Sequence, residues 1–305
     1  MTTPRVKLAP AVPDWDALGL ADPAALFAGG SMPRGSQLVE DREGVERWRT
    51  PLPGTVHDDG RRNGKPRGVG TGWLQVTRWS RPALGDVLRA RFTQPASVSL
   101  AERAWNLSCA LRAAGISTAE PLAVASEDRV VAARRSILVT RELEKMLPLS
   151  AWLERFDGAH DRRVLARALG SFLQRLASSG VRPAQLDFDA LVAHEKSGGR
   201  SDCAIEQIRD IQDRTLVGGL AVSALPELAL AEVLDGRIGA GSAAADRLEL
   251  VRQLGRSLPP ALRPTTSDVL RCLRGALGST ADRAERHAAA RQLFGVTRGE
   301  VRRQA

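Results

Sequence analysis

The sequence predicts an α+β protein in two lobes, because strand-like segments occupy its first half and helical segments its second half. Residues 73–79 and 86–92 alternate apolar and polar side chains as half-buried strands do. Two further strands are expected around residues 121–125 and 137–140. From Ser150 onward, apolar residues recur at helical spacing.

Residues 99–115, between the two pairs of strands, predict a helix with marked ends. Ser99 and Glu102 have the spacing of a capping box, in which each side chain accepts a hydrogen bond from the other residue's backbone N–H. Gly115 provides the C-terminal stop. One apolar face follows from steps of four and three along Leu100, Ala104, Leu107, Leu111 and Ala114.

Three more helices are expected in the second half of the chain. Apolar residues between 164 and 176 make a long amphipathic helix that ends at Gly180. Residues 269–277 make another, closed by Gly278, and a basic helix follows at about 280–294.

These elements suggest three regions. Residues 1–40 contain several Pro and Gly residues and only short apolar runs, which predicts a flexible N-terminal arm. The strands and the capped helix predict an N-lobe at residues 41–143. The later helices predict a helical C-lobe at residues 144–305.

The composition excludes several classes of protein. With 43% hydrophobic and 26% charged residues, the 305-residue chain has the composition of a folded globular protein. No apolar run reaches the length of a membrane-spanning helix. The first residues lack the apolar core of a secretory signal, so we expect a cytoplasmic protein. The three cysteines are too far apart for a zinc motif and odd in number, namely Cys109, Cys203 and Cys272.

The chain is basic, with a net charge of +9, and nearly all of its basic residues are arginine. The only lysines are Lys7, Lys65, Lys145 and Lys196. Residues 42–91 hold 11 basic and 5 acidic side chains. Such a patch attracts nucleic acid, anionic lipid headgroups or phosphorylated sugars. Because no nucleic-acid motif accompanies it, nucleic acid ranks last.

Other local patterns indicate structure more than chemistry. The glycines of residues 68–72 lack the spacing of a phosphate-binding loop and predict a turn. His57, Asp58 and Asp59 are adjacent, and adjacent ligands rarely converge on one metal ion. The six tryptophans are expected mainly in the core, although Trp48, Trp73 and Trp79 lie in the basic stretch, where an exposed ring could stack on a sugar or base.

Five segments in the second and third quarters of the chain and near its end resemble, in order, motifs of the bacterial lipopolysaccharide core kinases, the Kdo/heptose kinase family. They are Arg103-Ala-Trp105 with residues 111–116, Glu120-Pro-Leu122, residues 136–140 with Leu143, residues 173–181, and residues 266–278. The resemblance implies a two-lobed protein-kinase-like fold, with a small antiparallel-sheet N-lobe, one long helix and a helical C-lobe.

The resemblance assigns the nucleotide-binding positions to Ala90, Ala104, Thr140 and Leu143. Kinases of this fold hold the phosphates with a strand lysine, which a helix glutamate positions. Here the lysine falls on Ala90 and the glutamate on Ala104. No shift of register restores the lysine, because none occurs between residues 65 and 145.

The catalytic loop is altered as well. The family's loop falls on residues 180–192, where Pro183 replaces its histidine, Gln185 its aspartate and Ala190 its asparagine. Glutamine can exchange hydrogen bonds but cannot act as a base at neutral pH.

Some acidic residues remain. Asp187 and Asp189 lie inside the altered loop and could replace the lost base or a metal ligand. Asp210 is the candidate for the metal-binding aspartate, with Asp213 as a second candidate.

We therefore expect a pseudokinase related to the lipopolysaccharide core kinases, acting as a binding or regulatory module. Its expected partners are an active sugar kinase or an anionic glycolipid at the inner membrane face. This interpretation names no definite cofactor, and ATP and Mg²⁺ are expected only if activity or nucleotide binding is retained. The alternative is an active ATP-dependent sugar kinase that uses the relocated acids Asp187, Asp189 and Asp210 with ATP and Mg²⁺.

Overall fold

The computed structural model divides the chain into two compact units. The residues that it describes are 4–42, 44–53, 72–80, 99–127, 135–144, 146–155, 158–184, 186–194, 226, 228–231, 236–238, 244–257, 265–278 and 283–294. Unit 1 comprises Met1–Glu144, Arg175–Leu186 and Leu230–Ser242, and unit 2 comprises Lys145–Gln174, Asp187–Ala229 and Ala243–Ala305. The first segment of unit 1 ends beside the predicted lobe boundary, but two later segments of the expected C-lobe also belong to unit 1.

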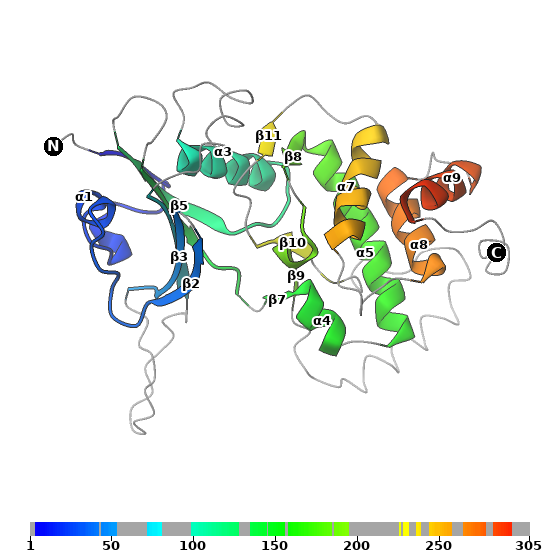
Figure 1. The fold of residues 1–305 in the computed structure, drawn as a ribbon, viewed down its shortest axis with the longest axis horizontal. Helices are drawn as coiled ribbons and strands as arrows, with labels where there is room; N and C mark the ends of the chain where they lie inside the picture. The colour runs from blue at the N-terminus through cyan, green and yellow to red at the C-terminus, as the bar shows by residue number, and fades with distance from the viewer. Residues whose placement is uncertain are drawn as a thin grey trace. The chain divides into compact units, whose positions relative to one another are not determined.

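Unit 1 is built on a six-stranded antiparallel sheet (Figure 1). In spatial order its strands are β1 (Arg5–Leu8), β5 (Glu120–Ser126), β6 (Ser136–Arg141), β4 (Trp73–Trp79), β3 (Val45–Pro51) and β2 (Gln37–Arg42). The strands predicted at residues 73–79, 121–125 and 137–140 are confirmed as β4, β5 and β6. The strand predicted at residues 86–92 lies outside the described residues.

Helix α3 (Leu100–Ala113) packs on one face of this sheet, which we call the α3 face. The predicted capping box is present, since the Ser99 hydroxyl accepts from the Glu102 N–H and the Glu102 carboxylate accepts from the Ser99 N–H, at 3.2 and 2.8 Å. Gly115 follows the helix with a φ of +73°, the left-handed conformation that ends many helices. A buried cluster joins helix and sheet through Trp79, Ala101, Ala104, Trp105, Val124 and Leu138.

The N-terminal segment covers the opposite face of the sheet. It contains β1, the 3₁₀ helix η1 (Asp16–Leu18) and helix α1 (Pro23–Phe27). Its buried side chains share one core with strands β4, β5 and β6, through Trp15, Leu18, Leu20, Leu26 and Phe27. The prediction of a flexible arm is therefore wrong for residues 4–40. Short apolar runs between prolines suffice here, because each large side chain that enters the core contributes about 1.5–3 kcal/mol.

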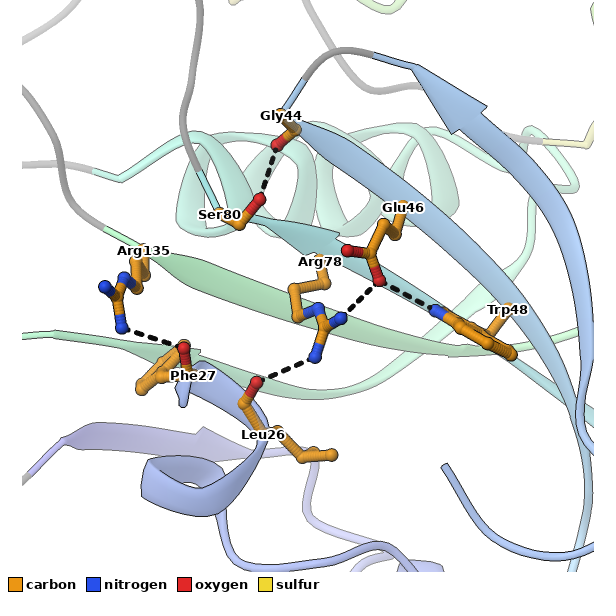
Figure 2. Close-up of polar contacts among 8 residues, drawn as sticks. All are labelled: Leu26, Phe27, Gly44, Glu46, Trp48, Arg78, Ser80 and Arg135. Carbon is orange, nitrogen blue, oxygen red and sulfur yellow. Dashed lines mark hydrogen bonds and ion pairs between the residues drawn. The ribbon is translucent and has the colours of Figure 1, made fainter. Parts of the chain in front are cut away.

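Two arginines fasten this segment to the sheet by its backbone (Figure 2). Arg78 of β4 donates from Nη1 to the Leu26 carbonyl at 2.9 Å and pairs through Nη2 with Glu46 of β3. Arg135 donates from Nη1 to the Phe27 carbonyl at 2.8 Å. Both carbonyls belong to the C-terminal end of α1, where backbone acceptors lack partners within the helix and cations are favoured.

Unit 1 also includes two short strands from later in the chain. β8 (Val181–Pro183) and β11 (Gly236–Ile238) form an antiparallel pair, and both contact α3. Strands of three residues are too short to show an alternating pattern, so the sequence did not predict them.

Unit 2 is mainly helical (Figure 1). Its helices are α4 (Leu149–Arg155), α5 (Ala159–Ser178, whose last turn lies in unit 1), α7 (Ala244–Ser257), α8 (Thr266–Leu277) and α9 (Arg283–Phe294). The predicted helices before Gly180, before Gly278 and at about 280–294 are confirmed as α5, α8 and α9. A three-stranded sheet was not predicted, and its order is β10 (Leu228–Leu230), β9 (Leu191–His194) and β7 (Met146–Pro148).

None of the helices in the described part of the chain has both the length and the apolar character needed to cross a bilayer.

Candidate functional site

The α3 face of the sheet extends beyond α3 onto β4 and β3, where its side chains are polar. Residues paired across neighbouring strands point to the same face. Arg49 is opposite Gln75, which is opposite Thr140. Two residues along each strand, Arg47 is opposite Thr77, and Thr77 is opposite Leu138, which belongs to the buried cluster between α3 and the sheet. We call Arg47, Arg49, Gln75, Thr77 and Thr140 the polar strip.

The two arginines of the strip are held by carboxylates. Arg49 Nε donates to Glu142 Oε2 at 2.7 Å, and its guanidinium carbon lies 4.3 Å from the centroid of the Trp73 ring. Arg47 Nη1 lies 2.9 Å from Glu40 Oε2. With side chains 38% and 20% exposed, both pairs are partly accessible to water.

The nucleotide-binding positions implied by the resemblance are separated in the structure. Thr140 lies on the polar strip and is buried. Ala104 is fully buried between α3 and the sheet, packed with Trp79 and Leu138. Leu143 follows the end of β6 and is half-buried. Ala90 lies outside the described residues. Sequence reasoning missed Arg47, Arg49, Gln75 and Glu142, although the alternation in Arg47-Trp48-Arg49 was a signal that two arginines share one face of a strand.

The basic residue of β4 and the acidic residue of α3 both have structural partners. Arg78, the basic residue of β4, has Glu46 and the Leu26 carbonyl as partners on the face opposite α3. Glu102, the acidic residue of α3, closes the capping box. Lys7 is on β1, with its Nζ 5.3 Å from the centroid of the Trp105 ring.

The altered catalytic loop is held mainly by apolar groups. Leu186, Phe188 and Leu191 are buried, and the Phe188 N–H donates to Ser257 Oγ of α7 at 2.8 Å. Asp187 is half-buried and precedes the 3₁₀ helix η2 (Phe188–Ala190), whose N-terminus it does not cap with its side chain.

The other predicted site residues carry little structural information. Asp189 lies within η2, and its side chain is not among those described. Gln185, Asp210 and Asp213 lie outside the described residues, as do His57, Asp58 and Asp59. The described part of the chain contains no group of three or more histidine, cysteine or acidic side chains that could hold a metal ion. The acids that it describes therefore do not form a metal site by themselves.

A comparison of the sequence with models of protein families identifies the family of this chain. Residues 47–204, slightly more than half of the chain, match the model of the lipopolysaccharide kinase (Kdo/WaaP) family. The chain belongs to this family. The lipopolysaccharide kinase fold expected from the sequence motifs is thus confirmed together with the α+β class.

One solved structure agrees with the fold. A structure described as WaaP in complex with acyl carrier protein is similar, with a TM-score of 0.57 and 16% sequence identity over 95% of this chain and 99% of that chain. A glucosamine kinase in crystal form B matches with 15% identity over 95% of this chain and 88% of that chain, at a TM-score of only 0.31. No curated protein matches the chain.

Proposed function

We propose that this member of the lipopolysaccharide kinase family is a pseudokinase, a binding or regulatory module that does not transfer phosphate. The observation that carries the proposal is that Arg78 bonds to Glu46 and to the Leu26 carbonyl, while Glu102 closes the capping box of α3. Arg78 is the basic residue of β4, the described strand that precedes α3, and Glu102 is the acidic residue of α3, the helix on which the resemblance places the kinase glutamate. Both side chains have structural partners elsewhere.

The alanine at position 104, where the resemblance places a glutamate, supports the same conclusion. A glutamate at this position in α3 would enter a packed apolar cluster, where an unpaired carboxylate is costly. The cluster has instead been completed with a small apolar side chain. The loss of the ion pair is thus matched by the packing around it.

The proposed ligand is an anionic glycolipid at the inner membrane face, with an active sugar kinase as the proposed protein partner. The lipopolysaccharide substrates of the family support the glycolipid ligand. The solved WaaP structure, which was determined with a bound protein, supports a protein partner in general.

The proposal is tested by thermal melting of the purified chain with ATP, with and without Mg²⁺ or Mn²⁺, alongside a phosphotransfer assay. We expect no metal-dependent rise in Tm and no turnover. A bound ligand at a hundred times its Kd would stabilise the fold by about 2.7 kcal/mol and would be detected. A metal-dependent rise together with turnover that Asp187→Asn abolishes would show an active kinase and refute the proposal.

A further inference from the structure

The exposed side of α5 carries three arginines, and none of them pairs with an acid in the described part of the chain. Its exposed side chains are Arg163, Arg167, Ser171, Arg175 and Ser178. In the described part of the chain, the three arginine side chains make no ion pair or hydrogen bond. Some arginines of the neighbouring helices are paired in contrast, since Arg252 of α7 pairs with Glu249 and Arg271 of α8 with Asp268.

Helix geometry arranges these arginines in a row. Arg163 and Arg167 are one turn apart, about 6 Å along the axis, and Arg175 follows about 12 Å further. Each step of four residues turns by about 40°, so the row winds slowly over the exposed side of the helix. The buried side of α5 is fixed independently, through Leu165, Leu169, Phe172, Leu173 and Leu176.

We propose that this row, Arg163, Arg167 and Arg175, docks the protein on the phosphate headgroups of an anionic lipid bilayer. The inference rests on the glycolipid-binding role proposed above and names the surface that performs it. Guanidinium groups bind phosphate oxygens in bidentate pairs, so three unpaired arginines complement a flat array of phosphates.

The composition of the row favours a bilayer over other polyanions. Protein interfaces usually contain apolar or aromatic side chains at their centre, and α5 exposes none among its described residues. Single-stranded nucleic acids are generally bound with aromatic rings that stack on the bases, which this row also lacks. Binding by arginine alone is electrostatic attachment to a charged surface.

The test is sedimentation with vesicles of phosphatidylglycerol and phosphatidylcholine, compared with vesicles of phosphatidylcholine alone. The wild-type chain should bind the anionic vesicles and lose binding when salt rises from about 0.1 to about 1 M. The variant R163Q/R167Q/R175Q should bind about a hundredfold more weakly, at about fivefold for each arginine. Its melting temperature should match that of the wild type, since exposed substitutions change stability little.

The matched control is R34Q/R256Q/R291Q, which removes three exposed arginines from outside α5 and changes the net charge equally. It should bind the anionic vesicles within a few-fold of the wild type. Equal weakening of both triple variants would overturn the assignment to α5 while leaving the glycolipid role intact. Failure of the wild type to bind anionic vesicles would overturn both. Binding of a duplex oligonucleotide in place of vesicles would identify the row as a nucleic-acid surface and also overturn the inference.

Discussion

Gly170 of α5 and Gly275 of α8 meet where the two helices come closest, and neither position has room for a side chain. A Cβ built on Gly170 would lie 2.3 Å from the Cys272 carbonyl oxygen and 2.8 Å from the Gly275 Cα. A Cβ on Gly275 would lie 2.8 Å from the Gly170 Cα. Because all of these are backbone atoms, the helices themselves would have to separate.

The first prediction concerns this contact. Gly170→Ala should lower the free energy of unfolding by about 1–3 kcal/mol or more, since extra atoms in a packed core force the backbone to move. This would occur although alanine favours a helix more than glycine does. Urea unfolding measures it, with Ser171→Ala, an exposed change in the next residue of α5, as the control. A Gly170→Ala chain as stable as the control would contradict the close approach.

The second prediction concerns Arg78. Arg78→Met should destabilise the fold by about 3 kcal/mol, because the half-buried Glu46 carboxylate and the Leu26 carbonyl lose a buried charged donor. Limited proteolysis should then cut earlier within residues 4–40. Arg141→Met is the matched control, since Arg141 pairs with Glu120 at 3.0 Å in the same sheet but has a side chain 44% exposed. It should cost less than about 1 kcal/mol. Equal costs for both variants would show that Arg78 does not fasten the N-terminal segment.

The third prediction concerns thiol reactivity. In a Cys203→Ser background, a maleimide at about neutral pH should label Cys109, which is exposed, well before Cys272, which is half-buried and whose pKa burial raises to about 12. Partial burial raises the pKa of Cys109, while Lys7 and Arg112 act in the opposite direction, so its labelling should be slow. Mass spectrometry of the labelled peptides identifies the sites. Rapid labelling of Cys272 in the native protein would disprove the packing between α5 and α8.

The fourth prediction follows from Cys272 and alkaline pH. Burial raises the pKa of its thiol from 9.0 to about 12. Above about pH 9 the unfolded chain loses this proton while the folded chain keeps it, so the stability contributed by the neutral thiol is lost as pH rises toward 12. The free energy of unfolding should fall by up to about 1.4 kcal/mol for each pH unit in this range.

Comparison with Cys272→Ala isolates this effect. The variant should show a shallower loss of stability above about pH 9 in chemical unfolding, although its overall stability is lower. Parallel curves for the two proteins would mean that the thiol is hydrated in the folded state.

Sequence reasoning located the elements whose signals are local. The capping box of Ser99 and Glu102 and the glycines after α3 and α8 set helix ends within a few residues, and the alternation in β4 marked a strand. The N-terminal segment was missed because its order comes from distant contacts. Trp15 and Phe27 are buried by strands that lie far away in the sequence, and the Phe27 carbonyl is bound by Arg135.

Only the part of the candidate site that depends on local sequence was predicted. The absence of a lysine is a property of the sequence and needs no structure. The hydrogen bond from Arg78 to the Leu26 carbonyl and the pairing of Arg49 with Glu142 depend on which face of the sheet each side chain occupies. A shift of one residue reverses that face, and the sequence alone did not fix the register of β3.

The division of unit 1 into three segments has a consequence for biosynthesis. Helix α3 contacts β8 and β11, which are made from residues 181–183 and 236–238. Synthesis from residue 144 to residue 242 takes about 5–20 s at ordinary rates of translation. By the start of that interval all strands of the six-stranded sheet have been synthesised, while the strands that contact α3 from later in the chain have not. A chaperone that binds apolar helices co-translationally would have its opportunity in this window, before the last segment of unit 1 is complete.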